Sequence, residues 1–362
     1  MLERFHVPES DQIRVPVASL RTTVERVFEG VGMPEQDARQ AADVLVYADP
    51  RGVETHGVSN MLRIYVGQFR AGQLNPTPKL EIVQESPAGL VIDGDGGLGL
   101  VQCPRAMNMV IDRAREYGVG TAAIRNLGHT GAIGYHAMLA AEQDMVGLSM
   151  TASGSQVLPA LAAEPRMGTN PISIAAPAGD RPWLLFDAAM STSASNKLRI
   201  ARRLGVPVPA GWLASWNGTP IMEDSPVPED GDFHQLPLGS TRELGSHKGF
   251  GLALMVEVLA TMLSGSVPRM IDKDVGSRHF LAAFNIASFT DVDGFKQSMD
   301  DMLGVLVDTK PAPGADRVIY PGVAEAEELD DRLANGIPLH PEVIDWFNEI
   351  TSELDIPKME TA

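Results

Sequence analysis

Two glycine-flanked histidines are the residues of this sequence whose type and setting best suit proton chemistry. His56 stands between Thr55 and Gly57, and His129 lies in the run Gly-His-Thr-Gly at 128–131. Histidine exchanges a proton near neutral pH, and a neighbouring glycine lets a ligand approach the backbone closely. Two such histidines could act as general acid and substrate-orienting donor in the reduction of a carbonyl group. On local grounds, a helix-capping turn explains the first segment better and the second equally well.

Three further segments combine small, hydroxyl or cationic residues in settings that suit a phosphate or a ribose. Segments 168–171 and 187–193 adjoin apolar strands, and their hydroxyl and backbone N–H groups could bind such ligands. Segment 245–251 opens an apolar helix, where Lys248 and the helix N-terminus indicate an anion site. Ordinary turns account for the same residues.

A literal G-x-G-x-x-G occurs at Gly94–Gly99, after a strand expected near 90–93. In a Rossmann fold this pattern places a pyrophosphate at the start of the next helix, and Arg125 would then meet a 2′-phosphate. Against that hypothesis, residues 100–104 separate the last glycine from the expected helix, and no run of βαβ units follows. A glycine-rich turn at a strand end is the alternative.

Composition excludes several classes of function. The 362 residues suggest two domains, and their net charge of −18 would repel a nucleic acid. No apolar run is long enough for a membrane span, and the first 15 residues lack the apolar core of a signal peptide. The single cysteine, Cys103, excludes an internal disulfide and a cysteine-rich zinc site, which fits a cytoplasmic protein.

No metal is required by the sequence. It lacks H-E-x-x-H, a P-loop and any carboxylate cluster with metal-ligand spacing. The acid pairs Asp93/Asp95 and Asp272/Asp274 are interpreted as turn residues.

Apolar periodicity predicts helices at both ends of the chain and a mixed α/β region between them. Helices are expected over 15–31, 35–47, 61–71, 104–117, 133–144, 196–204, 249–264, 292–306, 324–335 and 341–353. Strands are expected over 81–84, 89–93, 120–124, 146–149, 172–176, 183–186 and 280–289, with a long loop or a small hairpin over 205–239. Residues 1–78 and 311–362 are predicted to form one discontinuous helical domain around an α/β domain at 79–310.

Seven segments, in order along the chain, resemble the malate/L-lactate dehydrogenase family. The matching segments are 48–76, 92–102, 128–141, 168–177, 187–201, 246–265 and 318–322. The family lacks the Rossmann fold and includes ureidoglycolate and sulfolactate dehydrogenases and imine-reducing piperideine-carboxylate reductases. The resemblance implies a homodimer with an unusual α/β domain that binds NAD or NADP. The turn at Gly94–Gly99 is part of the family pattern without being its cofactor fingerprint, so the Rossmann hypothesis is set aside.

The resemblance also implies roles for individual residues. His56 is a candidate proton donor assisted by Thr55, and His129 matches the acid/base histidine of ureidoglycolate dehydrogenases; the choice between the two stays open. The residues on cofactor-binding segments are Ser153, Thr169, Asp187, Ala188, Ala189, Ser191, Ser193, Lys248 and Gly322.

Three positions depart from the family pattern. Asn60 stands where relatives usually carry the arginine that binds the substrate carboxylate, and Arg63 lies one helical turn further on as a possible substitute. Imine-reducing members carry Asp where this chain has Lys197, which favours 2-oxo acid chemistry. Val323 replaces the usual Glu after the run Tyr-Pro-Gly.

The sequence thus predicts an NAD(P)-dependent oxidoreductase that interconverts a small 2-hydroxy acid and its 2-oxo acid. The alternatives are a cyclic imine reductase and a cofactor-binding protein without turnover.

Overall fold

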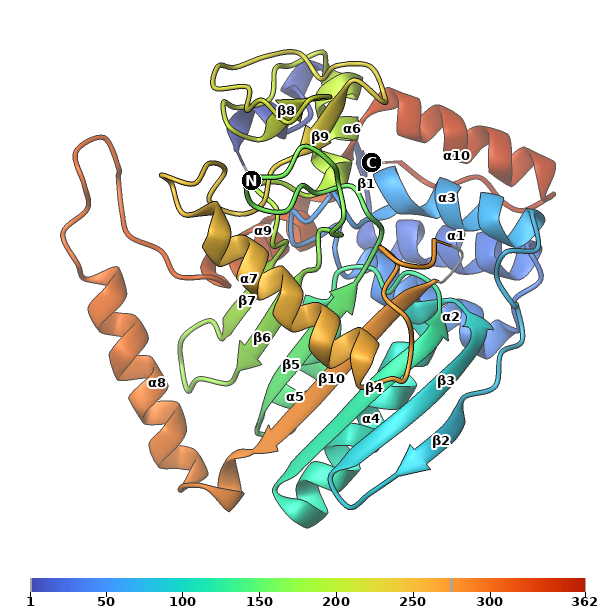
Figure 1. The fold of residues 1–362 in the computed structure, drawn as a ribbon. Helices are drawn as coiled ribbons and strands as arrows, with labels where there is room; N and C mark the ends of the chain where they lie inside the picture. The colour runs from blue at the N-terminus through green and yellow to red at the C-terminus, as the bar shows by residue number, and fades with distance from the viewer. Residues whose placement is uncertain (1, 274–275, 362) are drawn as a thin grey trace.

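The computed structural model describes residues 2–273 and 276–361. Figure 1 shows a twisted sheet with helices on both faces and a separate helical layer built from the two ends of the chain. Asp274, one of the predicted turn acids, lies outside the described residues.

Seven strands of the described chain form one mixed sheet, and the last of them in sequence lies at its centre. Their spatial order is β2 (Glu81–Glu85), β3 (Gly89–Gly97), β4 (Val119–Leu127), β10 (Ser277–Asn285), β5 (Met145–Ala152), β6 (Ile172–Ala176) and β7 (Leu184–Ala188). Within this sheet β3 and β4 pair in parallel and every other neighbouring pair is antiparallel. This topology contradicts the Rossmann hypothesis, which requires a parallel sheet.

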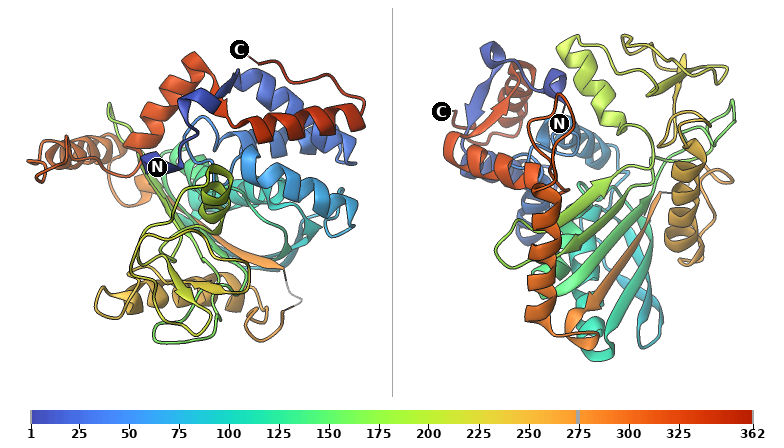
Figure 2. Two further views of the ribbon diagram at one scale, coloured as in Figure 1. Left: turned by 90° about the horizontal axis from the view of Figure 1, so that it is seen from above. Right: turned by 90° about the vertical axis from the view of Figure 1, so that its left-hand side faces the viewer.

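The central strand shows why both faces of the sheet must be covered. Alternate residues of β10 point to opposite faces. Leu281 and Ala283 join a core with α4 (Gly99–Tyr117), whereas Phe280 and Ala282 join one with α7 (Ser246–Val256). Figure 2 shows α7 across one face of the sheet, with α4 and α5 (Gly134–Ala141) on the other.

The two chain ends meet in one helical layer. Its apolar core draws on α1 (Val17–Gly30), α2 (Glu35–Val46) and α3 (Val58–Arg70) from the N-terminal side and on α10 (Pro341–Glu353) from the C-terminal side. Strands β1 (Ile13–Val15) and β11 (Ile337–Leu339) pair beside it, next to α9 (Val323–Asn335). The exact domain boundaries stay a prediction, because Leu98 and Leu100 at the start of α4 share this core.

The remaining elements flank the sheet. They are η1 (Glu3–Phe5), η2 (Glu9–Asp11), α6 (Ser195–Leu204), the hairpin of β8 (Leu213–Ser215) with β9 (Phe233–Gln235), the π-helical η3 (Glu257–Met262), η4 (Ile286–Ser288) and α8 (Val292–Val307). In Figure 1 α8 extends from the sheet at the left-hand side. None of the helices in the described ranges is long and apolar enough to cross a membrane.

Two predicted helix starts were wrong, in a way that matters for the site. The helix expected from residue 104 begins at Gly99, directly after the glycine turn, because Pro104 lies within its first turns without ending it. The helix expected from residue 61 begins at Val58, two residues after His56. Both histidines therefore lie next to helix termini.

Candidate active site

The structure brings His56 and His129 together from distant parts of the chain. His56 precedes α3 and His129 lies between β4 and α5. Their rings are nearly parallel, with an interplanar angle of 7° and centroids 5.6 Å apart. Neither Nε2 atom has a hydrogen-bond partner in the described chain, and neither is among its buried unpaired polar atoms. The two Nε2 atoms are therefore available to a ligand.

The hydrogen bonds of His129 define its tautomer. The backbone N–H of Gly131 donates to Nδ1 at 3.1 Å, and the Tyr65 hydroxyl lies 2.6 Å from the same atom. Because a backbone N–H can only donate, Nδ1 must accept, which puts the proton of the neutral ring on Nε2. His129 thus presents an N–H donor to the site.

His56 is not restricted in this way. Its Nδ1 lies 2.9 Å from the Thr55 hydroxyl, which can either donate or accept. Asn196, at the start of α6, donates to the Thr55 carbonyl at 2.6 Å and so fixes the turn. His56 Nε2 can therefore accept a proton while Nδ1–H donates to Thr55.

Both rings are neutral at physiological pH. Burial lowers the pKa of His56 to about 4. Burial lowers that of His129 to about 3, with smaller contributions from the other imidazoles at His56, His279 and His136. A neutral imidazole can accept a proton as a general base, and it has no ion pair to break first.

The glycine turn 94–99 positions the His129 loop instead of a phosphate. A Cβ at Gly99 would overlap Thr130 and the His129 carbonyl, and Gly128 N–H donates to the Gly97 carbonyl at 2.8 Å. The N-terminus of α4 is thus covered by the loop that carries His129. Close backbone approach is the reason for glycine here.

Two further buried histidines lie behind this loop. His136 Nε2 donates to the Thr130 carbonyl at 2.9 Å, which is a structural contact. His279 Nδ1 lies 2.9 Å from the Thr151 hydroxyl, which is 3.4 Å from that of Thr130. These contacts tie the His129 loop to α5, β5 and β10.

The predicted cofactor residues on β7 adjoin the same loop. Asp187 accepts the Gly134 N–H at 2.7 Å, at the start of α5. Part of the residue is exposed to solvent, yet burial of the carboxyl group by neighbouring atoms raises its pKa to about 6. Ala188 and Ala189 follow it, and Gly322 packs against the start of β7, where a Cβ would overlap the Trp183 carbonyl.

The predicted hydroxyl residues are connected by Asn170. Its side-chain oxygen accepts the Ser153 N–H at 3.0 Å, and its amide group donates to Ala253 in α7 and to the buried Glu257. The hydroxyls of Ser153 and Thr169 lie 3.4 Å apart. Asn170 has a positive φ of 36°, so this polar contact is maintained against backbone strain.

The segment with Ser191 and Ser193 lies next to Thr169. Met190 N–H donates to the Thr169 carbonyl at 2.7 Å, and the Ser191 hydroxyl donates to the Ser193 carbonyl at 2.6 Å. Lys248, at the start of α7, is exposed and has no ion-pair partner in the described part of the chain. Hydroxyl groups, a carboxylate and an unpaired ammonium are groups that suit the ribose and phosphates of a dinucleotide.

The two candidate substrate residues contact other parts of the protein in this structure. Asn60 is buried, donates to the Glu54 carbonyl at 2.7 Å, and leaves its side-chain oxygen buried without a partner in the described region. Arg63 lies 3.6 Å from Glu342 and over the Trp346 ring of α10.

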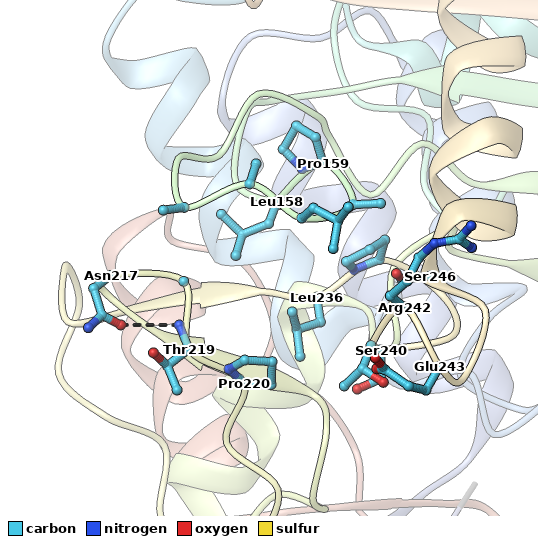
Figure 3. A pocket seen from close by; sticks show the side chains of 17 residues that line it. Leu158, Pro159, Asn217, Thr219, Pro220, Leu236, Ser240, Arg242, Glu243 and Ser246 are labelled. Carbon is cyan, nitrogen blue, oxygen red and sulfur yellow. Dashed lines mark hydrogen bonds between the residues drawn. The ribbon is translucent and has the colours of Figure 1, made fainter.

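A cavity of about 450 Å³ lies near the start of α7, apart from the histidines (Figure 3). Leu158, Leu236 and Pro237 form apolar walls, with Arg242 and Ser246 at the polar side. Neither histidine lines it, so the cavity does not locate the reacting centre. In the ranges 2–273 and 276–361, no cluster of His, Cys, Asp or Glu has the arrangement of a metal site.

Sequence reasoning missed Tyr65, Asn170 and Asn196. Tyr65 occupies an apolar position of α3 and is fully buried, so its periodicity indicates core and nothing more. Asn170 lies in segment 168–171, which was predicted to suit a phosphate or a ribose. Nothing in the local sequence indicated its contacts with α7. A buried polar group that joins separate elements becomes visible only in three dimensions.

Comparison with known proteins identifies the family and agrees with this fold. The profile of the family described as malate/L-lactate dehydrogenase matches residues 15–348. A malate dehydrogenase from Pyrococcus abyssi is 38% identical over 366 residues, covering 99% of this chain and 100% of that protein. An L-sulfolactate dehydrogenase from Methanocaldococcus jannaschii is 32% identical over 336 residues, covering 91% and 94%. A solved malate dehydrogenase from Pyrococcus horikoshii OT3 covers 98% of both chains with a TM-score of 0.88 at 35% identity.

The chain therefore belongs to the malate/L-lactate dehydrogenase family and has the non-Rossmann α/β fold of that solved relative. It is an oxidoreductase of the dehydrogenase class that acts on the CH–OH group of hydroxy acids.

Removing the Tyr65 hydroxyl should impair this dehydrogenase without unfolding it. We expect Tyr65→Phe to lower kcat about 5- to 30-fold, since one hydrogen bond to a reacting group is worth roughly 1–2 kcal/mol. Steady-state kinetics beside Tyr117→Phe, the same change at an exposed helix end, measures the effect. Equal rates for the two variants would show that Tyr65 only fills space.

Proposed function

We propose that this protein is an NAD(P)-dependent oxidoreductase that interconverts a small 2-hydroxy acid and its 2-oxo acid. The observation that carries the proposal is the stacked pair of neutral histidines, one fixed as an Nε2–H donor and the other free to take up a proton. Oxidation of an alcohol needs both a hydrogen-bond donor for the oxygen and a base for its proton.

The proposed mechanism divides the work between the two rings. A bound nicotinamide would accept the hydride from the substrate carbon. His129 orients the substrate oxygen through Nε2–H, and His56 takes the hydroxyl proton on Nε2 as the C–O bond becomes C=O. Thr55 then accepts a hydrogen bond from Nδ1–H of the imidazolium. Reduction of the 2-oxo acid returns the same proton from His56.

The test is a panel of 2-oxo and 2-hydroxy acids with both cofactors, run on wild type and His56→Asn. We expect turnover of at least one acid, and a loss of kcat of about 10²- to 10⁴-fold in the variant. Because burial lowers the pKa of His56 to about 4, hydroxy-acid oxidation should show its unit-slope acid limb near pH 4, where the base becomes protonated. An ordinary histidine would show that limb near pH 6.5.

The alternatives give different results in the same panel. Reduction of a cyclic imine with no 2-oxo acid turned over would identify an imine reductase. Quenching or enhancement of NADH fluorescence on binding, with no turnover of any acid, would identify a cofactor-binding protein.

For the substrate carboxylate, Lys197 is the cation that the structure favours. It follows Asn196, which bonds to the His56 turn, and its ammonium lies 5.6 Å from the Trp212 ring centroid. Burial lowers the pKa of Lys197, and no carboxylate lies within ion-pair distance in the described chain. A partly buried ammonium without a counter-ion gains most from an anionic ligand. Direct contacts from Asn60 and Arg63 stay predictions.

We expect Lys197→Met to raise the KM of the 2-oxo acid about 10- to 100-fold and to leave the cofactor KM unchanged, because one charged contact is lost. Arg199→Met, an exposed cation of the same helix, is the matched control. An unchanged acid KM would remove Lys197 from the site. Asn60→Arg and Arg63→Met in the same assay test the other two positions: a changed acid KM would place them in the pocket.

A homodimer is the proposed assembly. Exposed apolar side chains lie on η3 and α8, among them Val258 at 52% and Val305 at 70% exposure. Apolar surface of this extent on a soluble protein indicates a protein–protein contact, and the family resemblance makes a second copy of the chain the expected partner.

Light scattering after size exclusion should give twice the chain mass for wild type. We expect Val258→Asp and Val305→Asp to yield monomers, since a charge in an apolar interface is desolvated without a partner. Val83→Asp on the exposed edge strand β2 is the control. A monomeric wild type, or charged variants that stay dimeric, would refute this assembly.

A further inference from the structure

Asp49 is a fully buried carboxylate directly beneath the turn that carries His56. Its two side-chain oxygens lie 3.1 and 3.2 Å from the backbone nitrogen of Val58, the first residue of α3. Arg332 of α9 approaches from the other side, but it donates to the Asp49 carbonyl oxygen at 2.8 Å. The carboxylate itself is therefore directed at the helix start.

A carboxylate at this place determines where α3 begins. The first N–H groups of a helix lack intrahelical partners and carry a partial positive charge, which an acceptor with a negative charge satisfies. His56 lies two residues before Val58, and Tyr65 lies two helical turns beyond it. Both residues contact His129, so one anchor sets the position of both relative to that ring.

Gly57 confirms how closely this anchor is packed. A Cβ at position 57 would overlap the Asp49 carboxylate. The backbone of Gly57 is extended, with φ −88° and ψ −170°, so its conformation does not require glycine. Glycine is needed here for the room that it leaves to the carboxylate.

The surroundings of Asp49 make its charge sensitive to pH near neutrality. Burial raises the pKa of Asp49 to about 7; the Val58 N–H lowers it, Glu54 raises it and Arg332 lowers it. Glu54 lies 3.1 Å from Arg332, so one guanidinium faces two buried carboxyl groups. The titratable and charged groups around Asp49 are Glu54, Glu328, Arg332 and, beyond Glu54, His6.

We propose that Asp49 is a positioning residue of the active site, which holds His56 and Tyr65 in place against His129 through its bond to the start of α3. The kinetic readout of this inference rests on the proposed function, whereas the spectroscopic readout below does not.

The first test replaces the charge and keeps the shape. At pH 8 we expect Asp49→Asn to lower kcat about five- to ten-fold with an unchanged cofactor KM, since a neutral acceptor holds the helix start less firmly. In wild type, kcat should fall by a similar factor as the pH falls from 8 to 6. It should then stay constant until the pH approaches 4, where His56 becomes protonated. The variant should be flat over this range, at that constant level. Asp37→Asn, another buried acid in a helical first turn, is the matched control.

The second test uses the contact with Gly57. Gly57→Ala should lower kcat in the same way, because its methyl group displaces the carboxylate. Asp49→Ala/Gly57→Ala should be no worse than Asp49→Ala alone, since the overlap is gone. Additive losses in the double variant, or a wild-type pH profile in Asp49→Asn, would overturn the proposal.

The third test does not depend on turnover. The imidazole NMR signals of His56, assigned with His56→Gln, should shift near pH 7 in wild type and not in Asp49→Asn. A His56 signal unaffected by Asp49 would overturn the proposal even in an active enzyme. If wild type turns over no acid, the proposed function fails and this result alone decides the role of Asp49. The same titration of wild type and of Gly57→Ala decides it if Asp49→Asn does not fold.

Discussion

The hydrogen bond from Tyr65 to His129 joins the helical layer to the sheet layer at the histidines, beside an apolar core and a few other polar contacts such as the ion pair of Arg105 with Asp37. Tyr65 belongs to the core of the helical layer, whereas the His129 loop follows a central strand of the sheet. Apolar packing is non-directional and tolerates small shifts, but a buried hydroxyl left without a partner is costly. The polar contact therefore selects one position of α3 relative to the sheet. The geometry of both histidines depends on that position.

Close backbone contact supports this interaction from the side of the sheet. The loop before His129 can lie on the start of α4 because positions 99 and 128 have no side chains. Gly99 is also the last of the three glycines in the G-x-G-x-x-G pattern. In a Rossmann fold they leave a helix N-terminus open to phosphate, whereas here they bring a protein loop against it. The glycine pattern indicates that another group approaches the backbone closely. It does not tell whether that group is a phosphate or a protein loop.

The sequence predicted the repeating features well and the contacts between elements poorly. Apolar periodicity located nearly every helix and strand, because each repeats over several turns or residues. The glycine-flanked histidines also stood out locally. Tyr65 could not be recognised, since a tyrosine in an apolar stripe looks like core, and neither could the pairing of Asp49 with a helix start nine residues away. Nothing in the sequence indicated that Asn60 donates to the Glu54 carbonyl, so its place in the substrate site stays a prediction.

Electrostatics explains why the proton chemistry and the recognition of charge have to involve different residues. Both histidines are held neutral by burial, so neither can attract an anionic acid or a dinucleotide in the free protein. The net charge of −18 would repel both ligands from the surface at large. Attraction must then come from cations without local counter-ions, and Lys197 and Lys248 have none in the described chain. In the proposed function, the neutral histidines are available for proton transfer, while these two ammonium groups would balance the charge of the ligands.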